Sequence, residues 1–239
     1  QTLSGTNTYK SITTISGGTL TIAADNNLGA APSSATAGAL VLNGGTLSVT
    51  ADITLNENRG ISLGASGGTL NVASAKTLTY GGIVADVSGA AGSLTKTGAG
   101  TLTLTGSSTY SGATNVNAGT LKLTSTGVIY NSASIASSAS AITTVASGAV
   151  LELSSWGWAG TGGLGQRYYD ANALGINGGS LRYSGASNST RSGATFESTT
   201  SGVTWTLDDG GATPTYKSVI NGSVTFSGVG NIVFAHAIN

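Results

Sequence analysis

The 239-residue sequence predicts an all-β fold, a parallel β-helix (β-solenoid) in which short strands stack coil upon coil. Three observations predict it. Aliphatic residues alternate with threonine or serine in short runs, glycine precedes each run, and the runs recur every 19 to 32 residues. Alternation places the aliphatic side chains on one side of a strand. Recurrence within about 20 to 50 residues is typical of solenoids and other arrays.

Each predicted strand carries two apolar residues separated by one polar residue. The pairs are Leu20/Ile22, Leu47/Val49, Leu70/Val72, Leu102/Leu104, Leu121/Leu123, Leu151/Leu153 and Leu181/Tyr183. The corner glycines before them are Gly18, Gly45, Gly68, Gly100, Gly119, Gly148 and Gly179. We interpret the seven strands as equivalent rungs. About 11 coils of ~22 residues, each rising ~4.8 Å, would form a rod of roughly 50 Å.

An antiparallel sandwich is the alternative fold. The stretch "LNGGTLSV" from Leu42 to Val49 contains Asn-Gly between apolar residues, which is a strong hairpin signal. Sandwich edges are normally protected by charges or prolines, however, and this chain has 8% charged residues and two prolines. A solenoid confines its open edges to its two ends, so the sequence favours the solenoid.

Composition excludes several functions. Nine basic and nine acidic residues cancel, which leaves no electrostatic footprint for nucleic acid or an anionic membrane. Cysteine is absent, so disulfides, thiolate metal sites and thiol catalysis are excluded. No apolar run reaches the length of a membrane-spanning helix, so we expect no membrane insertion by this segment. We expect no cofactor and no metal.

Two longer segments are repeated along the chain. Segment A spans Thr2 to Ile22 and aligns without a gap on Thr103 to Leu123; segment B spans Ala39 to Val49 and aligns on Ala173 to Tyr183. The whole chain, 1–239, is thus expected to be a single solenoid unit. Its predicted parts are repeat A (1–22), a linker with segment B (23–93), repeat A (94–123), a linker with an extra rung and an aromatic loop (124–172), and segment B with the start of a third A (173–239).

The stretch "LTKTGAGTLTLTGSSTYSGATNVNAGTLKL", Leu94 to Leu123, closely resembles the autotransporter-associated β-strand repeat of bacterial autotransporter passenger domains and giant surface proteins. Its Lys-Thr-Gly-Ala-Gly-Thr-Leu opening, Thr-Tyr-Ser-Gly centre and Asn-Ala-Gly-Thr-Leu close follow the family's order and spacing. The resemblance implies a right-handed parallel β-helix displayed outside the outer membrane, at the bacterial cell surface. In the third A, Phe226 replaces Lys96, which departs from the pattern.

Three functions are carried forward. The first is a structural rod that displays or assembles a surface protein, with end-to-end stacking of copies into a filament as its expected partnership. The second is an adhesin that touches a glycan or protein through the loop "SSWGWAGTGGLGQRYYDAN", residues 154–172. Exposed aromatic rings are common contact platforms. The candidate contact residues are Trp156, Trp158, Arg167, Tyr168 and Tyr169.

The third function is a polysaccharide hydrolase or lyase, because some parallel β-helices cleave sugars with clustered carboxylates. Asp52, Glu57 and Asp86 are isolated in the sequence, and the GxSxG match at Gly64–Gly68 lacks a base, since His236 is the one histidine. We therefore assign no catalytic residue and predict that the chain is not an enzyme.

Thr-x-Thr pairs such as Thr19/Thr21 raise a further hypothesis, a flat hydroxyl lattice of the kind that binds ice. If the seven strands are equivalent rungs, the outward position of Thr21 is occupied in the other rungs by a mixture of residue types. These are Ser48, Asn71, Lys122, Glu152 and Arg182. The expected lattice is therefore broken, and the rows are interpreted as solvated polar ladders.

Overall fold

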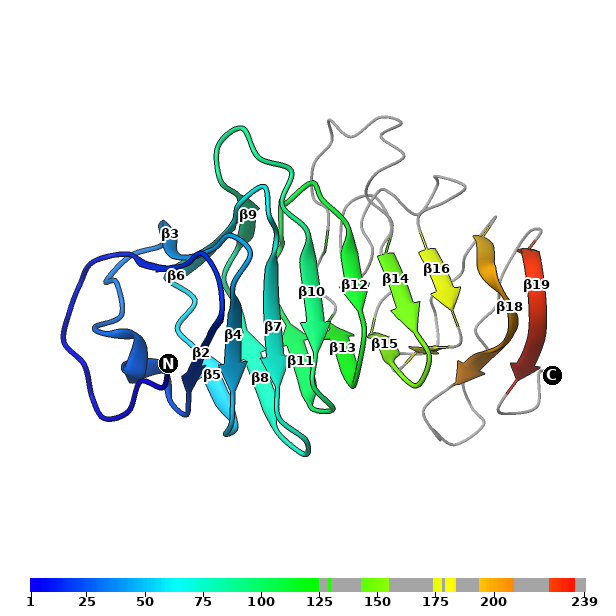
Figure 1. The fold of residues 1–239 in the computed structure, drawn as a ribbon, viewed down its shortest axis with the longest axis horizontal. Coiled ribbons are helices and arrows are strands. Elements are labelled where there is room, and N and C mark those ends of the chain that lie inside the picture. The colour runs from blue at the N-terminus through cyan, green and yellow to red at the C-terminus, as the bar shows by residue number, and fades with distance from the viewer. Residues whose placement is uncertain are drawn as a thin grey trace.

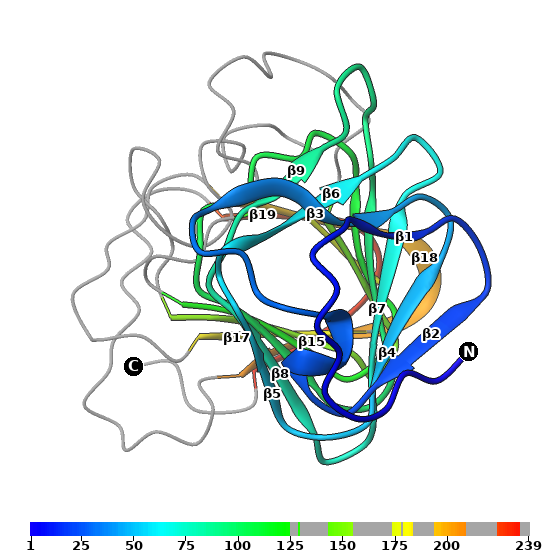
Figure 2. The ribbon, with the colours of Figure 1, turned by 90° about the vertical axis from the view of Figure 1, so that its left-hand side faces the viewer.

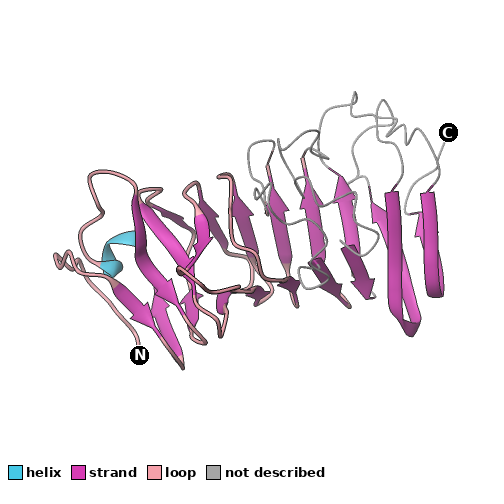
Figure 3. Cartoon of the chain, turned by 90° about the horizontal axis from the view of Figure 1, so that it is seen from above, coloured by secondary structure: helices cyan, strands magenta, loops and turns pink. Residues whose placement is uncertain are grey.

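The computed structural model describes residues 1–124, 129, 143–154, 174–177, 179–183, 194–208 and 224–234. It confirms the predicted all-β parallel β-helix. Strands lie side by side along one long axis (Figures 1 and 3), and the view along that axis shows three walls around a common interior (Figure 2). Every strand pair in the described residues is parallel, which rules out the antiparallel sandwich for this part of the chain.

We name the walls face one, face two and face three. Face one contains β1 (Thr13–Ile15), β3 (Thr36–Leu42), β6 (Arg59–Leu63) and β9 (Val84–Asp86). Face two contains β2 (Thr19–Ile22), β4 (Thr46–Val49), β7 (Gly68–Val72), β10 (Leu94–Thr97), β12 (Thr114–Val116), β14 (Thr143–Ala146) and β16 (Leu174–Asn177). Face three contains β5 (Ile53–Leu55), β8 (Thr77–Tyr80), β11 (Thr101–Leu104), β13 (Thr120–Leu123), β15 (Val150–Leu153) and β17 (Ser180–Tyr183).

The long strand β18 (Ala194–Asp208) joins faces two and three. Its first part pairs with β16 through Gly175 and Glu197, and its last part pairs with β17 through Ser180 and Thr206. The last strand, β19 (Val224–Phe234), pairs with β18 along both parts, with a register irregularity between Ser198 and Val203. Faces two and three therefore share hydrogen-bonded strands at this end of the described stack.

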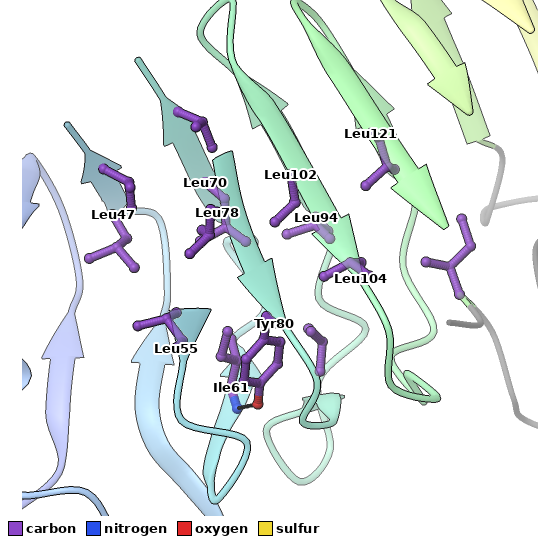
Figure 4. Packing of buried hydrophobic residues seen from close by; sticks show 14 of the residues in the cluster. Leu47, Leu55, Ile61, Leu70, Leu78, Tyr80, Leu94, Leu102, Leu104 and Leu121 are labelled. Carbon is purple, nitrogen blue, oxygen red and sulfur yellow. Dashed lines mark hydrogen bonds between the residues drawn. The ribbon is translucent and has the colours of Figure 1, made fainter. Parts of the chain in front are cut away.

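The interior is filled by the apolar residues of each alternating strand (Figure 4). On face two Leu47 is paired in register with Leu70, and on face three Leu102 is paired with Leu121. All four side chains are fully buried, whereas Thr46 and Thr120 lie half-exposed beside them. The predicted inward and outward positions of these strands are confirmed.

Replacing Leu47 with alanine should therefore lower the free energy of unfolding by about 2 to 5 kcal/mol, because the side chain leaves a cavity between two coils. The control Thr46→Ala removes an outward side chain and should cost far less. Urea denaturation followed by circular dichroism measures both. Equal losses in the two variants would contradict the inward packing of Leu47.

The prediction that the seven glycine-led strands are equivalent rungs is wrong. Those at Leu20, Leu47 and Leu70 lie on face two, in the order β2, β4 and β7, whereas those from Leu102 onward lie on face three. The spacing of 32 between Gly68 and Gly100 crosses from one face to the other. A glycine corner followed by an alternating strand specifies a turn into a wall, and both face two and face three use it.

Coil length also differs from the expected ~22 residues. Paired residues on neighbouring coils are as close in sequence as Thr101 and Thr120 and as far apart as Thr143 and Leu174. Nine coils are stacked on face two of the described chain if β18 and β19 are counted, instead of about 11. Corner loops of unequal length account for the difference, because they lengthen a coil without adding a strand.

The repeated segments do not return to the same wall. In the first copy of segment A the two strands are β1 and β2, on faces one and two; in the second copy they are β12 and β13, on faces two and three. Segment B shifts in the same way, from β3 and β4 to β16 and β17. The second copy of each segment therefore begins one face further around the solenoid than the first copy does.

A short 3-10 helix, η1 (Asp25–Leu28), occupies face three of the first coil, where later coils have a strand. Asn27 favours it because its side-chain oxygen accepts hydrogen bonds from the backbone N–H groups of Ala23 and Ala24 at 2.9 Å. Arg59, at the start of β6, is buried against this helix. Its guanidinium binds the Asp25 carboxylate at 2.9 Å and donates to the carbonyls of Leu28 and Gly29 at 2.9 and 2.6 Å.

Candidate functional site

The five candidate contact residues of the aromatic loop lie outside the described residues. They are Trp156, Trp158, Arg167, Tyr168 and Tyr169, all within 155–173. Their exposure and their role in binding stay predictions. The site is therefore built from the repeat motifs and the outward faces of the described coils.

Lys96, from the opening motif of the second repeat A, is the largest departure from an apolar interior. It lies on β10 at an inward position between Leu70 and Val116 of the neighbouring coils, and it is fully buried. Its ammonium donates to the carbonyls of Thr97 and Gly98 at 2.7 Å, and to that of Ala118 on the next coil at 3.1 Å. Lys96 thus joins two successive corners.

Burial lowers the pKa of the Lys96 ammonium to about 8, below its ordinary value of 10.5. The unfolded chain therefore holds a proton between about pH 8 and 10.5 that the folded chain has lost, so stability should rise with pH in this window. Between pH 8 and 10 we expect a rise on the order of 2 kcal/mol in the free energy of unfolding, measured by urea denaturation.

The Lys96→Met variant is the control, because it keeps an unbranched buried side chain and has no proton to exchange. An equal rise in Lys96→Met would show that another group causes it. Above about pH 10.5 the trend should reverse. Burial raises the pKa of the Tyr80 phenol far above its ordinary value, so tyrosine ionises first in the unfolded chain and stability is lost there.

The Thr-Tyr-Ser-Gly centre of the repeat forms a bonded corner. The Tyr110 hydroxyl lies 2.6 Å from that of Thr114, and in the first repeat Tyr9 and Thr13 form the same pair at 3.0 Å. Ser111 donates its backbone N–H and its hydroxyl to Asp86 of the preceding coil at 2.9 and 2.6 Å. The motif therefore positions neighbouring coils.

Two of the acids, Asp52 and Asp86, and the GxSxG match have structural roles. Asp52 accepts a hydrogen bond from the Thr77 backbone at 2.8 Å and lies 3.6 Å from the Lys76 ammonium, both at an exposed corner. Asp86 holds the base of its corner loop by accepting from the backbone of Gly92 at 2.8 Å. Ser66 lies in the turn between β6 and β7, where its backbone N–H donates to the Asn43 side chain at 3.0 Å.

Face three carries a charged row on its outward side. Lys122, Glu152 and Arg182 are register partners on β13, β15 and β17. The Lys122 ammonium lies 2.6 Å from Glu152, and Arg182 lies 3.7 Å from the other oxygen of the same carboxylate. Asp208 follows Arg182 in register on β18. The ion pairs of Lys122 and Arg182 with Glu152 thus link three successive coils.

From β2 to β14, face two has a neutral outward side. Its outward positions form two rows, which we call row P and row Q. Row P is Thr19, Thr46, Thr69, Thr95, Asn115 and Thr144. Row Q is Thr21, Ser48, Asn71 and Thr97. Of the residues expected to interrupt this lattice, Lys122, Glu152 and Arg182 lie on face three instead. Ser48 and Asn71 lie in row Q, so the hydroxyl lattice of face two is interrupted by the Asn71 amide.

Alternation could have revealed two of these features. Lys96 shares its phase with Leu94, which places it inside the coil, and the uncharged rows follow from reading the strands of face two together. Alternation does not show which strands share a face, and without that assignment the uncharged rows cannot be recognised. In the described residues no helix is long and apolar enough to cross a membrane, and no group of three histidine, cysteine or acidic side chains is placed to hold a metal ion.

Comparisons with known proteins agree with the repeat motifs. A family model described as the passenger-associated-transport-repeat matches residues 1–22 and 94–123. The chain is also similar to the adhesin BmaC autotransporter of Brucella suis biovar 1 (strain 1330), with 38% identity over 123 residues. That match covers 51% of this chain and 3% of the adhesin, so the chain spans a small part of its relative's length. No solved structure matches the chain. Two segments of the chain therefore match the passenger-associated-transport-repeat, and both are built into the walls of a parallel β-helix.

Proposed function

We propose that this chain is a non-catalytic rod segment of a bacterial surface protein, where it holds other parts of that protein away from the cell. The observation that supports this most is that polar residues of the repeat motifs form hydrogen bonds within the solenoid itself. Lys96, Tyr110, Ser111 and Asp86 bind the protein's own coils. A repeat whose polar groups are used to join coils suits a scaffold.

The relatives support the same location. Passenger-associated repeats and an autotransporter adhesin both point to the exterior of the cell. Antibodies raised against the purified chain should label intact cells of the source bacterium, and protease treatment of intact cells should remove the label. Labelling that requires permeabilised cells would overturn the proposed location.

Deleting a whole coil tests the rod. Thr77 and Thr101 occupy equivalent positions on β8 and β11, so deleting residues 77–100 removes one turn and rejoins the walls in register. The shortened chain should fold and leave surface adhesion intact. Deleting residues 77–88 is the control, because it removes part of a turn and should prevent folding. A folded whole-coil deletion that abolishes adhesion would show that the coil itself carries the activity.

A second candidate function is adhesion through the 154–172 loop. The observation that favours it is the concentration of two tryptophans and two tyrosines within 14 positions, together with an adhesin among the relatives. Aromatic rings lose little conformational entropy on binding. The double variant Trp156→Ala/Trp158→Ala should keep the cooperative unfolding of the chain and weaken its binding to host cells. Unchanged binding would remove the loop from the proposal.

A further inference from the structure

Row P contains a run of four stacked threonines on adjacent strands of face two. Thr19, Thr46, Thr69 and Thr95 are successive register partners on β2, β4, β7 and β10. Neighbouring strands of a sheet lie about 4.8 Å apart, so the four hydroxyls repeat at about that interval along the solenoid axis. Figure 1 looks onto this face, with its strands in a continuous series.

The neighbouring row Q is held by its own hydrogen bonds. The Ser48 hydroxyl donates to the Asn71 side chain at 3.3 Å, and the Asn71 amide donates to the Thr97 hydroxyl at 3.0 Å. These bonds run from coil to coil and fix the side chains of row Q. Further along row P, the Thr144 hydroxyl donates to Asn115 at 2.8 Å.

The four threonines differ from these residues. Among the described residues, no side-chain hydrogen bond joins the hydroxyl of Thr19, Thr46, Thr69 or Thr95 to another protein group. Thr19 is exposed and the other three are half-exposed, so their hydroxyls face solvent. Each hydroxyl can both donate and accept a hydrogen bond. The run therefore presents a line of unused donors and acceptors beside a fixed row.

The residues next to this line are small and uncharged. The corners that precede the first three strands are glycine pairs, Gly17–Gly18, Gly44–Gly45 and Gly67–Gly68, so the residues that lead into these strands carry no side chain of their own. From β2 to β14, face two has one charged residue, and this is Lys96, which is buried in the interior. The surface offers hydroxyls, methyl groups and peptide backbone.

We propose that the threonine run of row P is a docking surface for an extended, neutral polysaccharide that lies along the solenoid axis. Such a chain offers hydroxyl and ring oxygens at regular intervals, so several weak hydrogen bonds form together. Apart from the Gln1 amino group, which donates to the Thr19 carbonyl at 2.9 Å, the strands of face two from β2 to β14 offer an anionic glycan or a nucleic acid no exposed cation. A protein partner would find none of the large aromatic anchors that dominate protein interfaces.

This docking surface rests on the proposed function in one respect, because the chain would meet a polysaccharide only at the cell exterior. Binding is tested with the purified chain, without cells. Failure of cell-surface labelling and failure of binding are therefore separate results. The probes are cello-oligosaccharides and chito-oligosaccharides, with hyaluronate as the anionic comparison.

The test variant is Thr46→Val/Thr69→Val, which removes two hydroxyls and keeps the side-chain volume and the β-branched shape. The control is Thr101→Val/Thr120→Val on face three, where the threonines are stacked in the same way but lie beside the charged row. We expect a neutral oligosaccharide to bind the native chain and to bind the test variant about 30-fold more weakly, since each of the two lost hydrogen bonds is worth about 1 kcal/mol. The control variant should bind as the native chain does.

Four results would overturn the proposal. These are no binding of either neutral probe, equal binding of hyaluronate, equal weakening in both variants, or self-association of the native chain that the test variant alone abolishes. The last would make face two an interface between copies. Titration calorimetry gives the affinities, and the threonine methyl signals in nuclear magnetic resonance spectra show whether the probe contacts row P.

Discussion

Gly100→Ala is expected to lower the free energy of unfolding by at least about 3 kcal/mol, because the site has no room for a methyl group. A Cβ at this position would lie 2.2 Å from the carbonyl oxygen of Ala73 and 2.5 Å from that of Lys76. Both belong to the corner of the preceding coil, so relief requires the two coils to separate. The same residue is the second glycine of the Lys-Thr-Gly-Ala-Gly motif.

Gly17→Ala is the matched control. A Cβ there meets no atom within 4 Å, and its φ lies outside the left-handed region. Alanine also restricts the unfolded chain more than glycine does, so this variant should be as stable as the native chain or slightly more stable. Urea midpoints compare the two variants. A Gly100→Ala chain as stable as Gly17→Ala would mean that the coils are not in contact at this corner.

Arg59→Met is expected to cost about 3 to 5 kcal/mol, because it leaves a carboxylate and two carbonyls without their buried partner. Arg59 is 5% exposed and binds Asp25 through two nitrogens, at 2.9 and 3.2 Å. It also holds the end of η1. Arg59→Lys should lose most of the same energy, since an ammonium cannot reproduce the guanidinium fork.

The control for Arg59 is a surface pair. Lys76 and Asp52 are 3.6 Å apart and their side chains are 39% and 66% exposed. An exposed pair contributes about 0 to 1 kcal/mol, so Lys76→Met should be nearly neutral. Thermal unfolding of both variants distinguishes the two environments. Similar losses from Arg59→Met and Lys76→Met would show that Arg59 is not a buried anchor.

The inward and outward positions of single strands could be predicted from the sequence because they depend on alternation alone. Leu47 and Leu121 are buried as expected. The assignment of strands to walls could not be predicted, since the same glycine corner leads onto face two at Gly45 and onto face three at Gly119. The wall reached depends on how many residues the intervening loops add, and period-2 patterns do not encode this.

The candidate site was predictable to a smaller extent. The contact residues chosen from composition, led by Trp156 and Trp158, lie outside the described residues. Of the open threonines of row P, Thr19 was visible in a Thr-x-Thr pair, but its pair partner Thr21 was grouped with Lys122 and Glu152, which face another direction. Which side chains share a surface is a property of the coil register. It requires the positions of several corners at once.

The advance of the repeat by one face has a consequence for how such a protein diversifies. Thr21 in the first segment A corresponds to Lys122 in the second, and the two residues point out of different walls. One copied stretch of sequence thus supplies a neutral side in one direction and a charged side in another. The two copies of a segment therefore present their outward residues on different walls, where each meets different surroundings. If a segment were duplicated repeatedly with this offset, its successive copies would face successive walls of the rod. The outward residues of each copy could then change independently of those of the other copies.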